Sequence, residues 1–261
     1  MSYVPKSVIV LGGGVIGDLG GFCASTYKRG IDFIQIPTTL LAQVDASVGG
    51  KLGIDFHGLK NHIGVFQLPK AVLIDPIFID TLSIQQKKSG FAEIIKHAAI
   101  KDASMLKELN SNDLAFYQKN KKELIALIEK NVKIKMTVVQ KDEFEKGDRK
   151  LLNFGHTIGH AIENEHALLH GHAISIGMVY AAKISQVLLG FTDTGVIIET
   201  LKKYGLPISM RFDITHAMAV MQKDKKKAAQ GMQYVLLNKL GNAVYETVPM
   251  KSLEKLIKLY S

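Results

Sequence analysis

The stretch HTIGHAIE at residues 156–163 contains two histidines four residues apart, His156 and His160, and His170 follows ten residues after His160. Residues four apart lie on one face of an α-helix, so both imidazoles could point into one cavity. A histidine pair with a distant third ligand and an acid is how three-ligand zinc sites with an open coordination position are built. The alternative is that these histidines cap, hydrogen-bond or lie at the surface, since the glutamate of the H-E-x-x-H motif is absent.

The residues just before the pair favour a functional role. Asn153 and Gly155 are typical of a tight entry into a helix rather than of a solvated face. His97, His166 and His172 have no such setting, and we expect them to be structural or exposed.

A glycine-rich stretch, GGGVIGDLGG at residues 12–21, joins an expected strand to an expected helix. Glycines at such a junction let the backbone approach a phosphate, which the N–H groups of the helix N-terminus then bind. The spacing departs from the G-x-G-x-x-G motif and no Walker lysine follows, so tight strand–helix packing is the alternative. We expect Asp18 simply to cap the helix.

Two lysines, Lys51 and Lys60, lie in glycine-rich, polar stretches that we expect to be loops. Lysines of loops usually face solvent, so local context alone favours a solvated role. The nearness of Asp45 and Asn61 in the sequence is the one feature that favours a shared site.

Two kinds of structure have to position these residues. Strand patterns at 7–14, 32–38 and 71–76 alternate with helix patterns at 15–30 and 39–47, which predicts a parallel, three-layer α/β arrangement. After residue 83 helical periodicity dominates, at 87–100, 118–140, 156–166 and 173–190, before a hairpin at 231–248 around Gly241-Asn242 and a terminal helix. We therefore predict an α/β domain at 1–82 and a mainly α-helical domain at 83–261.

The chain is basic, with 33 Lys and Arg against 24 Asp and Glu. Such an excess attracts nucleic acid, an anionic membrane or a small anionic substrate. Much of it lies in residues 223–227 and in 118–135, which we interpret as an amphipathic helix. Its buried side is predicted to carry Leu124, Ile125, Leu127, Ile128 and Val132, which leaves its lysines mostly on a solvated face.

Composition limits the class of protein. A chain of 261 residues with 47% hydrophobic residues can bury a core, and its single cysteine, Cys23, forms no internal disulfide. No apolar run reaches the roughly eighteen residues of a membrane span, and the start MSYVPKSVIV lacks the features of a signal peptide. We expect a soluble cytoplasmic protein that binds neither membrane nor nucleic acid.

Seven stretches, in order from about residue 8 to 245, resemble the 3-dehydroquinate synthase family of sugar-phosphate cyclases. They are GGGVIGDLGGFCASTYKRGI, PTTLLAQVDASVGGKLGID, GLKNHIG, SGFAEIIKHAAI, DEFEKGDRKLLNFGHTIGHAIE, LHGHAISIGM and DKKKAAQG. The resemblance implies a lyase of the shikimate pathway that converts 3-deoxy-D-arabino-heptulosonate 7-phosphate to 3-dehydroquinate and phosphate, using NAD and a divalent metal, zinc or cobalt. It also implies the family fold, an incomplete Rossmann-like parallel sheet followed by a mostly α-helical C-terminal domain.

Matched residue by residue, the resemblance implies a metal site formed by Glu93, His156 and His170, whereas His160 resembles a catalytic, substrate-facing histidine. The cofactor site that it implies consists of Gly13, Gly14, Val15, Ile16, Gly17, Asp18, Thr38, Thr39, Lys51, Lys60, Phe78, Ile79, Asp80 and Thr81. The implied contacts to the anionic sugar phosphate are Asp45, Lys51, Asn61, Lys96, Lys135, Arg149, Asn153 and either Lys225 or Lys226. Arg29 resembles a residue that reaches the neighbouring subunit's site, which implies a homodimer.

Two positions depart from the family pattern. The family's chains carry a further α/β segment before the strand that opens this one, whereas Met1 stands a few residues before VIVLGGG here. We therefore expect this polypeptide, as a fragment or a shortened form, to bind NAD weakly or not at all by itself. His172 stands where an acidic residue often follows the HG pair, and we expect little consequence.

Three alternatives remain at this point. Another sugar-phosphate cyclase would make an inosose or a valiolone, although Arg149 and Asn153 favour a carboxylated substrate. A metal-dependent polyol dehydrogenase would release NADH. A shortened, inactive chain could act as a basic nucleic-acid-binding or regulatory protein, but interleaved surface aromatics, zinc-finger spacing and recognition motifs are missing from the sequence.

Overall fold

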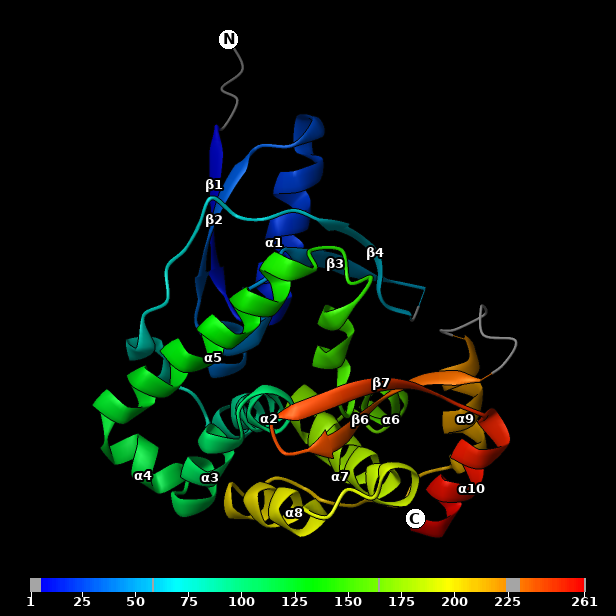
Figure 1. Cartoon of the computed structure of the whole chain (residues 1–261). Helices are drawn as coiled ribbons and strands as arrows, with labels where there is room; N and C mark the ends of the chain where they lie inside the picture. Colours follow the sequence, from blue (N-terminus) through cyan, green and yellow to red (C-terminus); the bar gives the residue numbers. More distant parts are fainter. Residues whose placement is uncertain (1–5, 58, 164, 224–230, 261) are drawn as a thin grey trace. The chain divides into compact units, whose positions relative to one another are not determined.

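A computed structural model describes residues 6–57, 59–163, 165–223 and 231–260. The chain divides into two compact units, the first made of Met1–Gly90 and Lys122–Phe144, the second of Phe91–Lys121 and Glu145–Ser261. Figure 1 gives the labels of the elements. The helix at 121–141 thus belongs almost entirely to the first unit, although it lies beyond residue 83 in the sequence.

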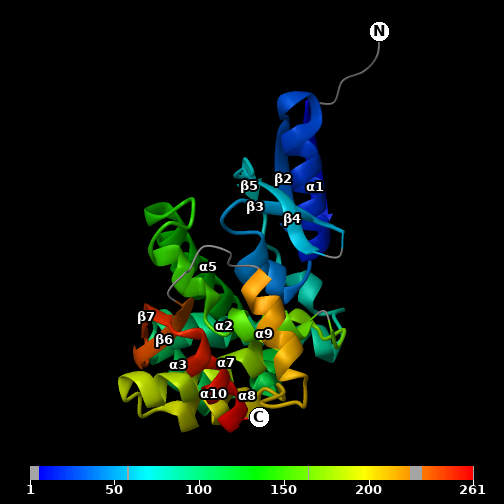
Figure 2. The same cartoon turned by 90° about the vertical axis from the view of Figure 1, so that its right-hand side faces the viewer.

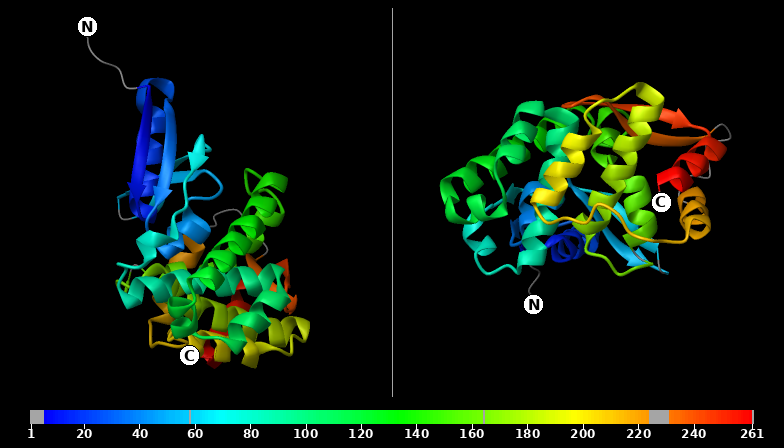
Figure 3. Two further views of the ribbon diagram at one scale, coloured as in Figure 1. Left: turned by 90° about the vertical axis from the view of Figure 1, so that its left-hand side faces the viewer. Right: turned by 90° about the horizontal axis from the view of Figure 1, so that it is seen from below.

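Three parallel strands form the sheet of the first unit, in the order β1 (Ser7–Gly12), β2 (Asp32–Pro37) and β5 (Ala71–Val72). Helix α1 (Gly14–Thr26) packs along β1 and β2, as the left view of Figure 3 shows, and the short 3₁₀ helix η1 (Tyr27–Arg29) follows it. Val10, Ala24, Phe33 and Leu52 form the buried core of this layer. The strand–helix–strand order with parallel pairing confirms the fold class predicted for this part of the chain.

Two antiparallel strands, β3 (Lys51–Phe56) and β4 (Leu59–Phe66), pair with each other beside α1 (Figure 2). The expectation that Lys51 and Lys60 lie in loops was therefore wrong. Glycine makes this pairing fit, because a Cβ on Gly64 would lie 2.5 Å from the carbonyl oxygen of Leu52. Because glycine has a low strand propensity, the sequence pattern did not predict the β3–β4 pair.

The remaining elements of the first unit are the π-helical turn η2 (Ala42–Ala46), the 3₁₀ helix η3 (Pro76–Ile79) and helix α5 (Lys121–Lys141). Leu124, Leu127 and Ile128 of α5 are buried as predicted, and Val132 is half-buried. The prediction for Ile125 was wrong, since this side chain is 48% exposed. One helical step turns a side chain by about 100°, which carries Ile125 off the face that Leu124 shares with Ile128.

The second unit is mainly helical. Its helices are α2 (Ile84–Lys101, of which residues 91–101 belong here), α3 (Ala103–Ser111), α4 (Leu114–Lys119), η4 (Asp148–Asn153), α6 (His156–Glu163), α7 (His170–Leu189), α8 (Thr194–Lys203), α9 (Ile214–Lys223) and α10 (Met250–Tyr260). Asp102 and Asp113 cap α3 and α4 by accepting from backbone N–H groups of the first turn. The predicted hairpin is present as β6 (Met232–Lys239) and β7 (Asn242–Val248).

Helix α7 is the central element of the second unit. It packs against α6, α8, α10 and β6, and the right view of Figure 3 shows α7 (yellow-green) beside α8 (yellow). Among the described residues it is the one helix that is long and apolar enough to cross a membrane, but 67% of its apolar window is buried inside the protein. A buried core helix has this composition as well, and α7 is explained as such.

Candidate functional site

Three predicted metal ligands lie together in the second unit. Glu93 comes from α2, while His156 and His170 are the first residues of α6 and α7. The Nε2 atoms of His170 and His156 lie 3.3 Å and 3.9 Å from Oε1 of Glu93. Ligand atoms of a tetrahedral zinc ion stand roughly 3.3–3.5 Å apart, given metal–ligand distances of about 2.0–2.1 Å. One carboxylate oxygen and two imidazole nitrogens are therefore within a small adjustment of a zinc or cobalt site.

Glycines hold the starts of α6 and α7 in place. Gly155, just before His156, has a φ of +80°, which a residue with a side chain adopts only with strain. A Cβ on Gly177 of α7 would lie 1.9 Å from the carbonyl oxygen of Gly155, so the two helices touch backbone to backbone here. The imidazole rings of His156 and His170 consequently lie with their centroids 5.4 Å apart.

The Nδ1 atoms of both histidine ligands have acceptors. Nδ1 of His156 lies 3.2 Å from the carbonyl oxygen of Phe154, and Nδ1 of His170 lies 3.2 Å from Oε2 of Glu163. Because a backbone carbonyl only accepts, the hydrogen of neutral His156 sits on Nδ1 and the lone pair on Nε2. This is the tautomer that a metal ligand needs at the side facing Glu93.

Buried charges set the protonation of the cluster. Glu93 is fully buried and forms an ion pair with the buried Lys96. Burial, followed by the charge of Lys96, holds the pKa of His156 well below 6.5, which keeps the ring neutral. Burial also lowers the pKa of His170, but hydrogen bonds and charge from Glu163 and Glu93 outweigh it and raise the pKa to about 9. A metal ion therefore competes with a proton on His170.

Further predicted substrate residues also belong to the second unit. His160 is exposed, and its ring centroid lies 5.0 Å from that of His156 and 5.9 Å from that of His170. Arg149 is buried on η4. Asn153 donates through Nδ2 to Oε1 of Glu145 at 2.6 Å.

Two predicted substrate residues of the first unit form an ion pair. Nζ of Lys135 lies 2.7 Å from Oδ1 of Asp45 and donates to the backbone carbonyl of Asp45 at 2.5 Å. Lys135 is buried on α5, where the sequence predicted mostly solvated lysines. This lysine is thus an exception to the solvated face.

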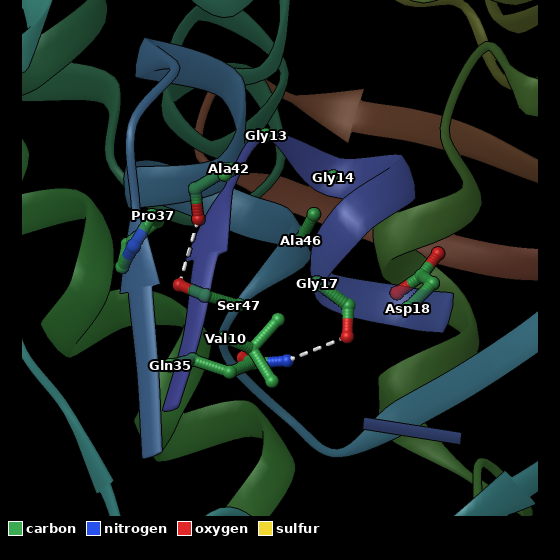
Figure 4. A pocket seen from close by; sticks show the side chains of 11 residues that line it. Val10, Gly13, Gly14, Gly17, Asp18, Gln35, Pro37, Ala42, Ala46 and Ser47 are labelled. Carbon is green, nitrogen blue, oxygen red and sulfur yellow. Dashed lines mark hydrogen bonds between the residues drawn. The ribbon is translucent and has the colours of Figure 1, made fainter. Parts of the chain in front are cut away.

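A pocket lies at the glycine-rich stretch of the first unit (Figure 4). Its lining consists of Val10, Gly12, Gly13, Gly14, Gly17, Asp18, Gln35, Pro37, Ala42, Ala46 and Ser47. Its cavity volume is about 10 Å³, the space of roughly one water molecule. The hollow is too small to enclose a dinucleotide, but it lies at the start of α1, where backbone N–H groups can bind a phosphate.

Gly13 packs closely against Thr39 at the rim of this pocket. A Cβ on Gly13 would lie 3.0 Å from Cγ2 of Thr39, and Gln35 donates to the carbonyl oxygen of Gly17 at 3.1 Å. The expectation that Asp18 caps the helix was wrong. Helix α1 begins at Gly14, its first turn holds no acidic residue, and its N-cap is Gly13. Asp18 instead lines the pocket one turn further on.

The other residues predicted for the cofactor and substrate are spread over the first unit. Thr38 donates its N–H to the carbonyl oxygen of Gly12, whereas Val15, Ile16, Lys51, Asn61, Asp80 and Thr81 are exposed, Phe78 is half-buried and Ile79 is buried. None of Phe78, Ile79, Asp80 and Thr81 is among the residues that line the pocket. Arg29 is exposed and has a φ of +71°. Lys225 and Lys226, and the side chain of Lys60, lie outside the described part of the chain.

Around the metal cluster and Asn153, sequence reasoning missed the contacts of the Phe154 carbonyl, Glu145 and Glu163. A signal for Glu163 was present, because residues 156, 160 and 163 follow the spacing of one helix face. The interactions of the Phe154 carbonyl and of Glu145 leave no such pattern in the sequence.

Comparisons with known proteins point to one family over most of the chain. The family model described as 3-dehydroquinate synthase N-terminal matches residues 4–89, and that described as 3-dehydroquinate synthase C-terminal matches residues 90–227. A 3-dehydroquinate synthase of Bacillus pumilus is 47% identical over 246 residues, which cover 92% of this chain and 67% of the relative. The enzyme of that name from Pyrococcus furiosus is 42% identical, over 96% of this chain and 74% of its own length.

Solved structures give the same fold. The 2-epi-5-epi-valiolone synthase of Streptomyces hygroscopicus, with NAD+ and Zn2+ bound, superposes with a TM-score of 0.90 at 27% identity, over 98% of this chain and 74% of that one. A 2-deoxy-scyllo-inosose synthase complexed with carbaglucose-6-phosphate, NAD+ and Co2+ superposes with a TM-score of 0.83 at 26% identity, over the same shares.

Proposed function

The chain belongs to the 3-dehydroquinate synthase family of aromatic amino acid biosynthesis, and from this premise we propose how its residues serve the reaction. The substrate is 3-deoxy-D-arabino-heptulosonate 7-phosphate, and the products are 3-dehydroquinate and phosphate. The observation that carries the proposal is the convergence of Glu93, His156 and His170, whose ligand atoms all lie within 4.8 Å of one another. Such a set of one oxygen and two nitrogen donors suits zinc or cobalt and leaves a position for substrate.

NAD and a divalent metal are the cofactors, and we propose that the metal is held by these three residues and NAD at the glycine stretch. A metal bound there would lower the pKa of a coordinated hydroxyl, and bound NAD would supply the hydride acceptor and donor. Gly13, Gly14 and Gly17 support this placement, because all three line the hollow at the first turn of α1, where backbone N–H groups can bind a phosphate. The net reaction is redox-neutral, so NAD is regenerated in each turnover.

The chain's own side chains supply binding and proton transfer. We assign the substrate carboxylate to Arg149, since a guanidinium binds a carboxylate through two parallel hydrogen bonds. His160 is exposed beside the ligand rings, which suits a group that hydrogen-bonds a substrate hydroxyl and relays its proton. Asn153 is held by Glu145, which orients its amide for a further hydroxyl. Lys96, which pairs with Glu93, keeps a positive charge next to the cluster.

Residues of the first unit complete the proposed set. Asp45 and Lys135 hold each other in place, so each presents a fixed charge to a polar ligand. Lys51, Asn61 and one lysine of 225–226 are assigned to the anionic groups of the substrate on the family pattern. A phosphate bound by lysines needs only point charges, which flexible lysines provide.

The direct test measures phosphate release from the heptulosonate phosphate in the presence of NAD and zinc or cobalt. The proposal predicts one phosphate and one 3-dehydroquinate for each substrate consumed, without net absorbance change at 340 nm. Accumulating NADH would favour a polyol dehydrogenase instead. Absence of turnover in a protein shown to bind both metal and NAD would contradict the proposal.

A second cyclase activity is tested by the same assay, because the fold is shared with a valiolone synthase at a TM-score of 0.90. Sequence identity separates the two, at 47% to a 3-dehydroquinate synthase and 27% to the valiolone synthase. We expect turnover of the carboxylated heptulosonate phosphate and none of a heptulose phosphate that lacks the carboxylate. The reverse preference would reassign the substrate.

We also propose a cytoplasmic homodimer in which Arg29 reaches the neighbouring subunit. The support is local: Lys28 and Arg29 both adopt positive φ, at 48° and 71°, and the Arg29 side chain is exposed. Strained backbone at a non-glycine residue often marks a functional contact. Sedimentation of a dimer whose activity falls in Arg29→Ala would support this role, and an active monomer would contradict it.

A further inference from the structure

Glu163 stands where it can control one of the proposed metal ligands. It is the last residue of α6, the helix that begins with His156, and its side chain is buried, with 7% exposed. Its Oε2 lies 3.2 Å from Nδ1 of His170, while Nε2 of the same ring lies 3.3 Å from Oε1 of Glu93. The imidazole of His170 is thus held between two carboxylates, one at each nitrogen.

We infer that Glu163 is a positioning residue that fixes the ring of His170 so that its Nε2 faces the metal. A carboxylate accepts the Nδ1 hydrogen, and this selects the tautomer whose lone pair lies on Nε2. The hydrogen bond also limits rotation of the ring, because turning it would break the contact to Glu163 and the approach to Glu93 together. The inference rests on the proposed function, since it takes the three-residue cluster to be the metal site.

His156 provides an internal comparison. Its Nδ1 donates to the backbone carbonyl of Phe154, at the same 3.2 Å. Both rings are therefore oriented through Nδ1. The acceptor for His156 is a backbone carbonyl, which a side-chain substitution does not remove, whereas the acceptor for His170 is the side chain of Glu163. The His170 contact is the one that a single substitution can test.

Charge gives Glu163 a second effect on the metal. Glu93 pairs with Lys96, and the charges of this buried pair cancel. Glu163 adds a further negative charge at the His170 side of the cluster. A divalent cation that enters such a site is stabilised by the second carboxylate, whereas it would meet a formally neutral ion pair without it.

The alternative is that Glu163 is itself a ligand, because Glu163, His160 and His170 also offer ligand atoms within 4.8 Å of one another. The geometry favours positioning, since the contact from Glu163 is to Nδ1 and that of Glu93 is to Nε2. One imidazole directs its two nitrogens to opposite sides, so a metal at Nε2 lies away from Glu163. The two roles predict different spectra for bound cobalt.

The experiment measures zinc affinity of the full chain by competition with a chelating dye, in the wild type, Glu163→Gln and Glu163→Ala. Loss of an outer carboxylate typically weakens metal binding by roughly 10–100-fold, and we expect Glu163→Ala in this range. We expect a smaller loss in Glu163→Gln, whose amide oxygen still accepts. Glu165→Gln is the matched control, because Glu165 is exposed and pairs with His166, Oε2 to Nε2, at 3.8 Å.

Two further readouts separate the outcomes. Urea midpoints of the metal-free proteins identify a variant that fails to fold, and Glu163→Gln then carries the comparison. The visible spectrum of the cobalt form should keep its band positions in both variants, since the donor atoms are unchanged. Zinc affinity of Glu163→Ala within threefold of the wild type would overturn the inference, and so would a cobalt spectrum that shows the loss of a donor atom. A wild type that binds no zinc would instead overturn the metal site itself.

Discussion

Replacing Gly177 by alanine tests how the metal ligands are held. Gly177 lies on α7, seven residues after His170, and packs against the backbone that leads into His156. The added Cβ would lie 1.9 Å from the Gly155 carbonyl oxygen, which is 1.5 Å inside ordinary contact at 3.4 Å. It would also lie 3.0 Å from the backbone nitrogen of Gly159. Backbone atoms cannot rotate away, so α6 and α7 have to separate.

The cost follows from that separation. Inserting a methyl group into a packed core costs about 1–3 kcal/mol, and a clash with backbone lies at the upper end. We expect the free energy of unfolding of Gly177→Ala to fall by about 3 kcal/mol. A shift of about 1 Å between His156 and His170 exceeds the roughly 0.5 Å that a metal constellation tolerates. Zinc affinity should therefore fall by at least about tenfold.

Urea denaturation and dye competition for zinc measure the two effects. Gly195→Ala is the control, because a Cβ there meets no atom within 4 Å on helix α8. It should be neutral or stabilise the protein by up to about 1 kcal/mol, and it should leave zinc affinity unchanged. If the free energy of unfolding of Gly177→Ala lies within 0.5 kcal/mol of that of the wild type, or if the variant binds zinc with unchanged affinity, the close approach of α6 and α7 does not hold the ligands.

Three further predictions concern charge. In the metal-free protein the pKa of His170 is raised from 6.5 to about 9, so protonated His170 contributes on the order of 3 kcal/mol to stability. This contribution is complete below pH 6.5 and is lost as pH rises through 9. Urea midpoints of the wild type should fall over this pH range and those of His170→Gln should not; parallel curves would refute the assignment. Lys135→Met removes the ion pair with Asp45 and should destabilise the protein by about 2–4 kcal/mol. Adding Asp45→Asn should recover part of this loss. A double variant no more stable than Lys135→Met would show that the loss of stability does not come from the broken ion pair. Of Lys225→Ala and Lys226→Ala, one should raise KM for the sugar phosphate at least about tenfold and the other should not, and unchanged KM in both would remove this lysine run from the site.

Local periodicity predicted several elements directly. The strand at 7–14, the helix after it and the hairpin around Gly241 follow from apolar patterns and turn residues, and the structure has them. The β3–β4 pair was missed because Gly53 and Gly64 dilute the strand pattern, although Gly64 permits the close pairing. Lys51 and Lys60 were consequently expected in loops, whereas they lie on these strands.

The candidate site shows the same limit at longer range. His156 and His160 are related by helical spacing, and Glu163 follows on the same face, so the helix itself was readable. No spacing rule connects Glu93 of α2 with His170 of α7, because only the packing of separate helices brings them within 3.3 Å. The resemblance to a family supplied that link, and the outer contact of Glu163 became visible only in the structure.

Anomalous diffraction from crystals grown with zinc tests the metal site most directly, with data collected on both sides of the zinc absorption edge. We predict one strong peak bonded to a carboxylate oxygen of Glu93 and to Nε2 of His156 and of His170, each at about 2.0–2.2 Å. A peak bonded to other residues, with these three side chains left apart from it, would contradict the site on which the proposed chemistry depends.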